Sequence, residues 1–207
     1  MKFTVQAFNA GTFWVPGPEV YWMENWNQRE EMNVLIYLVR GGGQNILVNT
    51  GPPQDLAVIN QAWFNFFGYP EARIVRTDDQ LPQNILLSQG LTSDDITTVI
   101  VTPLQAYATA NIHMFRNATI AISRRGWIED FQAPTYHLHV PRHLRIPPEV
   151  NSYLQNEGWD KVRLLADEEQ ITPGIRTFWA GVHHRSSLAV AIDTEKGVVI
   201  LTDCFFK

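Results

Sequence analysis

The chain has 207 residues, of which 45% are hydrophobic and 12% aromatic, enough to bury the core of one folded domain without disulfide bonds. A formal net charge of −5 disfavours binding to nucleic acids and to anionic membrane surfaces, and no apolar run approaches the roughly 20 residues that span a bilayer. The single cysteine, Cys204, excludes an intramolecular disulfide. We therefore expect a soluble cytoplasmic protein, folded as one domain over residues 1–207, that binds neither nucleic acid nor membrane.

Strand and helix patterns alternate along the chain. Residues 33–40 and 45–49 are apolar and rich in β-branched side chains, and the glycine-rich turn between them predicts an antiparallel hairpin. Apolar side chains at near-helical spacing predict a helix over 54–67 that ends at Gly68. In chain order, we also expect strands at 1–8, 97–102, 119–123, 161–166, 176–179, 188–193 and 198–202, helical segments at 92–95, 125–131 and 149–156, and a long loop at 132–148.

Strands dominate this pattern, and helices are interspersed between them. No internal repeat and no linker-like stretch divides the chain. The sequence therefore predicts one α/β domain with a sheet-on-sheet core flanked by helices.

Several strand ends carry small or polar residues at characteristic separations. Residues 46–53 form a strand that ends in Asn49-Thr50-Gly51, residues 99–111 form a strand and its following loop, and residues 178–183 precede a last strand that ends at Asp203. These segments, in this order, resemble the metallo-β-lactamase superfamily and most of all its lactonase-type hydrolases. That family has an Asp at the position of Asn49. The resemblance implies an αββα sandwich of two mixed β-sheets flanked by helices.

The resemblance fails where that family binds its metal ions. The family's His-x-His-x-Asp-His motif falls on Pro103, Gln105, Tyr107 and Ala108. Proline and alanine offer no donor atom, glutamine offers a neutral carbonyl, and a phenol with an ordinary pKa of about 10 is protonated near neutral pH. The usual pair of metal ions should therefore not assemble.

His183 and Asp203 are the two residues that remain from the family's ligand set. Zinc takes about four ligands, so two would hold it weakly. A further His follows the bridging Asp in the family, whereas this sequence stops four residues after Asp203. We expect the C-terminal part of the fold to be missing, either in the natural protein or in this chain alone.

Other residues offer alternatives. His137, His139 and His143 have ligand-like spacing and could form a relocated metal site, although three surface histidines need no special explanation. Cys204 could be a nucleophile with His183 as its base, whereas a cysteine at a strand end is more often a small buried side chain.

An aromatic group near the N-terminus is a candidate pocket or interface. It lies in a segment with Pro16, Gly17 and Pro18, which predicts a loop, and it could cover a ligand pocket, dock a partner or form a satellite core. Its members are Phe13, Trp14, Tyr21, Trp22 and Trp26.

These observations predict a catalytically degenerate member of the fold that acts as a non-catalytic binding or partner subunit, pairing with an active homologue or with a second copy of itself. The alternative is a metal-dependent hydrolase of a lactone, an ester or a related small molecule with a reduced or non-standard metal site. We expect no cofactor, and zinc if the chain holds a metal ion.

Overall fold

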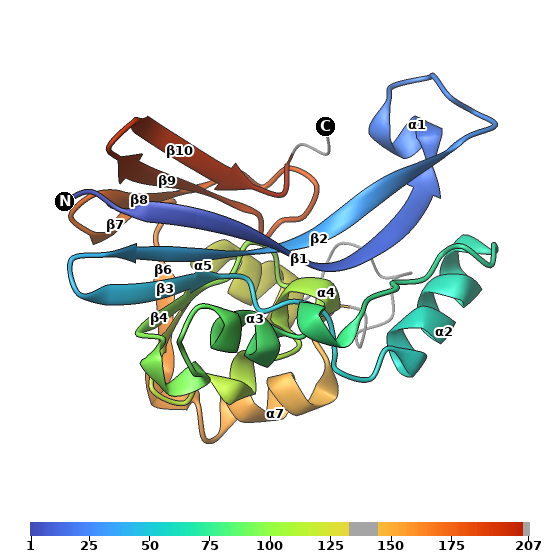
Figure 1. The fold of residues 1–207 in the computed structure, drawn as a ribbon. Coiled ribbons are helices and arrows are strands. Elements are labelled where there is room, and N and C mark those ends of the chain that lie inside the picture. Colours follow the sequence, from blue (N-terminus) through green and yellow to red (C-terminus); the bar gives the residue numbers. More distant parts are fainter. Residues whose placement is uncertain (133–144, 205–207) are drawn as a thin grey trace.

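The computed structural model describes residues 1–132 and 145–204. Two β-sheets lie face to face, and helices pack against the outer face of the first sheet (Figure 1). The first sheet has six strands in the order β1 (Thr4–Pro16), β2 (Arg29–Gly41), β3 (Gln44–Val48), β4 (Thr98–Ile100), β5 (Thr119–Ser123) and β6 (Val162–Leu165). Strands β1 to β3 are antiparallel and strands β3 to β6 are parallel, so this sheet is mixed, as predicted.

The second sheet contains the last four strands of the chain. Its order is β10 (Gly197–Thr202), β9 (Leu188–Thr194), β8 (Ile175–Trp179) and β7 (Glu168–Thr172). Every neighbouring pair is antiparallel, so this sheet differs from the mixed sheet that we expected.

The helical segments are short, and no helix of the described residues is long and apolar enough to cross a membrane. The α-helices are α1 (Gly17–Val20), α2 (Ala57–Phe67), α3 (Pro82–Ser88), α4 (Ala106–Thr109), α5 (Arg124–Gly126) and α7 (Pro148–Gln155). The 3₁₀ turns are η1 (Asp78–Gln80), η2 (Ser93–Asp95), η3 (Ile112–Met114) and η5 (Trp159–Lys161), and η4 (Trp127–Gln132) is π-helical.

The central strands are buried on both faces, which explains their continuous apolar sequence. In β3, Ile46 and Val48 face the core between the two sheets, whereas Leu47 faces the core under the helices. On the other side of the second sheet, Val198 and Ile200 are exposed, and no described helix covers them. The described layers are thus helix, sheet and sheet, and no described helix lies on the outer face of the second sheet.

Local sequence explains where most elements begin and end. Gly68 ends α2 in the left-handed conformation, with φ of 78°, as its sequence position predicted. Thr92 and Asp95 form a reciprocal capping box around η2. The loop prediction for the aromatic N-terminal segment was wrong for Phe13 and Trp14, which lie in β1, because that strand continues to Pro16 before the chain turns.

Candidate functional site

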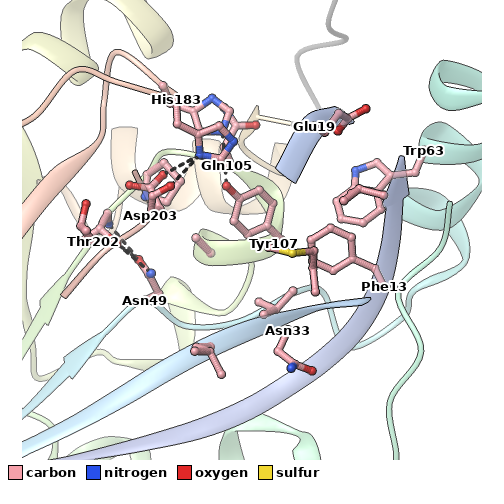
Figure 2. A pocket seen from close by; sticks show the side chains of 18 of the residues that line it. Phe13, Glu19, Asn33, Asn49, Trp63, Gln105, Tyr107, His183, Thr202 and Asp203 are labelled. Atoms are coloured by element: carbon pink, nitrogen blue, oxygen red, sulfur yellow. Dashed lines mark hydrogen bonds and ion pairs between the residues drawn. The ribbon is translucent and has the colours of Figure 1, made fainter. Parts of the chain in front are cut away.

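The candidate site lies where strands of both sheets end at one edge of the sandwich. Asn49 follows β3, Gln105 lies in the loop after β4, His183 lies in the loop between β8 and β9, and Asp203 follows β10. All of them line one pocket, and Figure 2 shows their side chains converging on it. The structure therefore brings together the residues that the sequence resemblance selected from distant parts of the chain.

His183, His184 and Asp203 form a cluster that could hold a metal ion. Each offers one ligand atom, and these atoms lie within 4.8 Å of one another. Nδ1 of His183 lies 3.3 Å from Oδ2 of Asp203, and the hydroxyl of Ser187 donates a hydrogen bond of 3.0 Å to the same oxygen. The other carboxylate oxygen, Oδ1, is buried and accepts no hydrogen bond from the described residues. A buried acceptor without a donor is destabilising, so this oxygen is suited to a cation.

The donor set fits one zinc ion. Two imidazole nitrogens and one carboxylate oxygen are ligands that zinc prefers, and three protein ligands with an open fourth position are typical of catalytic zinc sites. Two of these donors, His183 and Asp203, were expected from the sequence. The third is His184, which adjoins His183; the sequence allowed this His-His pair to be a surviving metal corner, but a pair of solvated loop histidines was the plainer interpretation.

Two residues at the positions of the lost ligand motif contact His184. The side-chain amide nitrogen of Gln105 lies 3.3 Å from Nδ1, and the hydroxyl of Tyr107 lies 3.3 Å from Nε2. In the neutral tautomer whose Nδ1 accepts from this amide, the ring proton lies on Nε2 and faces the phenol oxygen. A metal ion bound to His184 would replace one of these two hydrogen bonds.

Tyr107 is a neutral phenol in this environment. Burial raises the pKa of Tyr107 well above its ordinary value of 10.0, and the negative charge of Asp203 raises it further. The side chain therefore cannot serve as a phenolate ligand near neutral pH. Pro103 and Ala108, at the other two motif positions, also line the pocket and carry no donor atom.

The loop between β8 and β9 is held firmly by the protein itself. Ala180 N–H donates to the carbonyl of Ser187 at 3.0 Å, and Ser186 N–H donates to Oδ2 of the buried Asp130 at 3.0 Å. His183 has a positive φ of 69°, a conformation that a residue with a side chain adopts at some cost. Such strain is concentrated at functional sites, where the surrounding structure imposes it.

Asn49 is the second residue at the site with a left-handed backbone, with φ of 62°. Its amide donates to the hydroxyl of Thr102 at 2.9 Å, and its carbonyl oxygen accepts from the backbone N–H of Thr102 at 2.8 Å. Both residues are buried. Asn49 therefore ties the end of β3 to the segment after β4 through a pair of hydrogen bonds without adding a charge to the pocket.

The pocket has a polar end and an aromatic end. Its volume is about 320 Å³. His183 and Asp203 lie at the polar end, and Phe13 and Trp63 line the other (Figure 2). His184 lies beside His183 at the polar end, and the ring of Phe67 lies 6.3 Å from that of Trp63. An acyl or aryl group of a substrate would therefore be accommodated beside the polar cluster.

Most of the aromatic residues that we expected in the pocket lie elsewhere. Trp14, Tyr21, Trp22 and Trp26 are not among the residues that line it. Trp22 and Trp26 are 88% and 62% exposed, and their proposed role at an interface stays a prediction. Glu19, which sequence reasoning overlooked, lines the pocket from α1.

Two further candidates can be placed. His137 and His139, like His143, lie outside the described residues. Burial raises the pKa of the Cys204 thiol, and its sulfur lies 3.6 Å from the carbonyl oxygen of Val182, to which it donates. A thiol with a raised pKa is a poor nucleophile near neutral pH, so the environment disfavours a cysteine mechanism.

The sequence matches no protein-family profile and no curated protein. Solved structures do share its fold. An N-acyl homoserine lactone hydrolase with the product N-hexanoyl-L-homoserine at its catalytic metal centre superimposes with a TM-score of 0.77 at 20% identity, covering 98% of this chain and 76% of that one. A mutant of AiiA from B. thuringiensis, with N-decanoyl-L-homoserine bound in its active site, gives 0.75 at 22% identity, with 98% and 76% coverage.

A third similar structure, from Thermotoga maritima, is described as a metallo-β-lactamase. Its TM-score is 0.58 at 20% identity, with 98% of this chain and 78% of that chain covered. This chain thus spans about three quarters of the length of these structures. Together with the two facing sheets and the site at their common edge, the similarity shows that the chain has the metallo-β-lactamase fold.

Proposed function

We propose that the chain is a hydrolase that uses one metal ion, held by His183, His184 and Asp203, to cleave an ester, a lactone or a related small molecule. The observation that carries this proposal is the cluster of three ligand atoms within 4.8 Å of one another at the polar end of a pocket with an aromatic opposite end. The similar structures that act on N-acyl homoserine lactones support a substrate with a cleavable carbonyl group and an apolar arm.

The residues of the chain have distinct roles in this proposal. A bound zinc ion would polarise a substrate carbonyl and lower the pKa of water. Asp203 orients His183, and Ser187 orients Asp203 through the hydrogen bond to Oδ2. In the His184 tautomer with its proton on Nε2, Tyr107 accepts from this ring, which leaves the hydroxyl proton of Tyr107 for donation to an oxygen of the substrate.

This hydrolase was the alternative in the sequence analysis, and the findings favour it over the non-catalytic partner subunit that we placed first. The similar structures include metal-dependent hydrolases, and the described residues retain a possible metal site. Pairing with an active homologue or with a second copy stays a prediction.

A ligand-binding protein without turnover is the second candidate. It is favoured by one observation, the contacts of Gln105 and Tyr107 with both ring nitrogens of His184. These hydrogen bonds compete with a metal ion for the same nitrogens, and a strong network would leave the pocket able to bind a ligand but not to hydrolyse it.

Zinc binding tests the proposed centre. We expect protein purified without chelator to take up one equivalent of zinc, measured by elemental analysis and by titration calorimetry. His183→Ala and Asp203→Asn should each lower the affinity at least about tenfold, because each removes one of three ligands. Asp160→Asn, at an exposed position in η5, makes the same change of charge as Asp203→Asn away from the site and should leave the affinity unchanged.

Hydrolysis is measured on the zinc-loaded protein with p-nitrophenyl hexanoate and N-hexanoyl homoserine lactone. Zinc-dependent turnover that both site variants abolish is the expected result. Zinc binding without turnover would favour the ligand-binding candidate. Failure to bind zinc, or binding that neither variant weakens, would refute the metal centre.

A further inference from the structure

The aromatic end of the pocket is built as a set of mutually tilted rings. The ring of Trp63 lies 5.1 Å from Phe13, 6.3 Å from Phe67 and 6.4 Å from Tyr107, measured between centroids, with interplanar angles of 62°, 87° and 68°. Rings at such angles present their faces in several directions, as in the aromatic cages that bind quaternary ammonium groups. We call these four residues the aromatic cluster.

The charges around the pocket are negative. Glu19 and Asp203 contribute carboxylates, and none of the described residues that line the pocket is a lysine or an arginine. The two histidines and the neutral phenol of Tyr107 are the remaining titratable side chains of the polar end. A ligand with a carboxylate would therefore meet like charges, whereas a cation would be attracted.

Glu19 lies at the rim, on the same side of the pocket as Trp63 (Figure 2). Its carboxylate makes no hydrogen bond or ion pair with the described residues, and Arg29, the nearby cation, stacks on the ring of Tyr69 at 4.3 Å. Desolvation raises the pKa of Glu19 although the side chain keeps access to solvent, while the nearby His183 and Arg29 oppose this shift. A carboxylate in this state gains from a cationic partner.

We propose that this pocket binds an organic cation, a ligand whose alkylammonium group lies between the aromatic cluster and the carboxylate of Glu19. The proposal deepens the proposed function, on which it rests, by naming the class of substrate: an ester or lactone that carries an ammonium group on one arm. Its carbonyl would face the histidines and Asp203 while the cation occupies the aromatic end.

A pair of isosteric probes isolates the contribution of charge. Butyrylcholine and 3,3-dimethylbutyl butyrate have nearly the same shape, but only the first carries a quaternary ammonium group. We expect chelator-treated protein, which separates binding from turnover, to bind butyrylcholine about tenfold more tightly in titration calorimetry, because cation–π contacts and a carboxylate act on the cation alone.

Matched variants test which side chains contribute to the affinity for the cation. Glu19→Gln should lower the affinity for butyrylcholine about three- to tenfold and leave the neutral isostere unchanged. Glu24→Gln makes the same change of charge at an exposed position of the same hairpin tip, outside the pocket lining, and should have no effect. Phe13→Leu, which keeps an apolar side chain but removes a ring, should also reduce the preference for the cation.

Equal affinity for the two probes, or no binding of butyrylcholine, would overturn the proposal. An equal loss in Glu19→Gln and Glu24→Gln would also overturn it, since the effect would then come from the overall charge. These results are independent of the metal centre. Zinc-loaded protein that hydrolyses no ester would refute the proposed function, whereas the preference of the metal-free pocket for a cation would stand.

Discussion

At the scale of single residues, the site depends on two left-handed backbones. Asn49 and His183 both have a positive φ, although neither is a glycine. Asparagine tolerates this conformation better than most residues, because its short polar side chain can hydrogen-bond locally. Here the amide of Asn49 reaches Thr102 across the two strand ends, so the same residue provides both the turn and the tie between the strands.

Substitutions of Asn49 should separate these two contributions. Asn49→Ala loses both hydrogen bonds to Thr102, leaves a buried N–H unsatisfied and keeps a side chain at positive φ, so we expect a loss of about 2–4 kcal/mol in the free energy of unfolding. Asn49→Gly removes the conformational cost of a side chain at positive φ, so its loss in the free energy of unfolding should be about 1 kcal/mol smaller. Denaturant unfolding measures both, and equal losses would show that the backbone conformation contributes nothing.

At the scale of elements, the loop with the two histidines rests directly on α5. A Cβ atom added at Gly126 would lie 2.4 Å from Cβ and 2.5 Å from Cα of Ser186, too close for any side chain. Ser186 follows the histidines by two residues and precedes Ser187, which orients Asp203. The absence of a side chain at Gly126 therefore sets the position of the loop that carries the candidate ligands.

Gly126→Ala should disturb both stability and zinc binding. Because the overlap involves the backbone of Ser186, the whole loop must move, and we expect a loss of about 1–3 kcal/mol in the free energy of unfolding together with weaker zinc binding. Gly158→Ala is the matched control, since its Cβ would lie 2.5 Å from the ring of Tyr153, away from the pocket. Gly158→Ala should destabilise the fold while leaving the zinc affinity unchanged. If both substitutions lowered the zinc affinity equally, the contact between Gly126 and Ser186 would not be what positions the loop.

The sequence predicted elements whose ends carry strong local signals. The hairpin of β2 and β3 has a glycine-rich turn, and α2 ends at Gly68. It missed β7, an edge strand that begins Glu168-Glu169-Gln170, because polar residues on an exposed edge show no apolar alternation. It also missed α3, whose seven residues are too few for a clear helical period.

The candidate site was only half predictable for a related reason. Resemblance in the order of strands placed His183 and Asp203 at one edge, and the structure puts them within hydrogen-bonding distance. Glu19 was not recognised and His184 was given little weight, because their approach to the site depends on a hairpin tip and on a loop conformation that no local pattern specifies. Contacts between segments far apart in the chain arise from tertiary packing alone.

At the scale of the whole molecule, the β1–β2 ribbon extends beyond the rest of the sheet and carries α1 at its tip (Figure 1). This extension brings Glu19 to a pocket whose other side is formed by residues near the C-terminal end. The pocket is therefore assembled from both ends of the chain, and ligand binding should be coupled to folding of the whole molecule.

Buried and half-buried tyrosines should make that global stability sensitive to alkali. Desolvation raises the pKa of Tyr37, Tyr107 and Tyr153, and it raises the pKa of Tyr69 to about 12. Their folded-state pKa values exceed those of the unfolded chain, so the stabilisation is fully present below about pH 10 and is lost as the pH rises through the folded values.

We expect the free energy of unfolding to stay level from about pH 7 to 9 and then to fall by at most about 1.4 kcal/mol per tyrosine for each further pH unit. Urea titrations at increasing pH measure the slope, and near-ultraviolet absorbance reports when the phenolates form. Tyr37→Phe should flatten the slope by one tyrosine, because phenylalanine has no proton to lose. The prediction would be contradicted if the tyrosines ionised near pH 10 while the protein remained folded and equally stable. That result would mean that the phenols are not desolvated, including the phenol of Tyr107 beside His184.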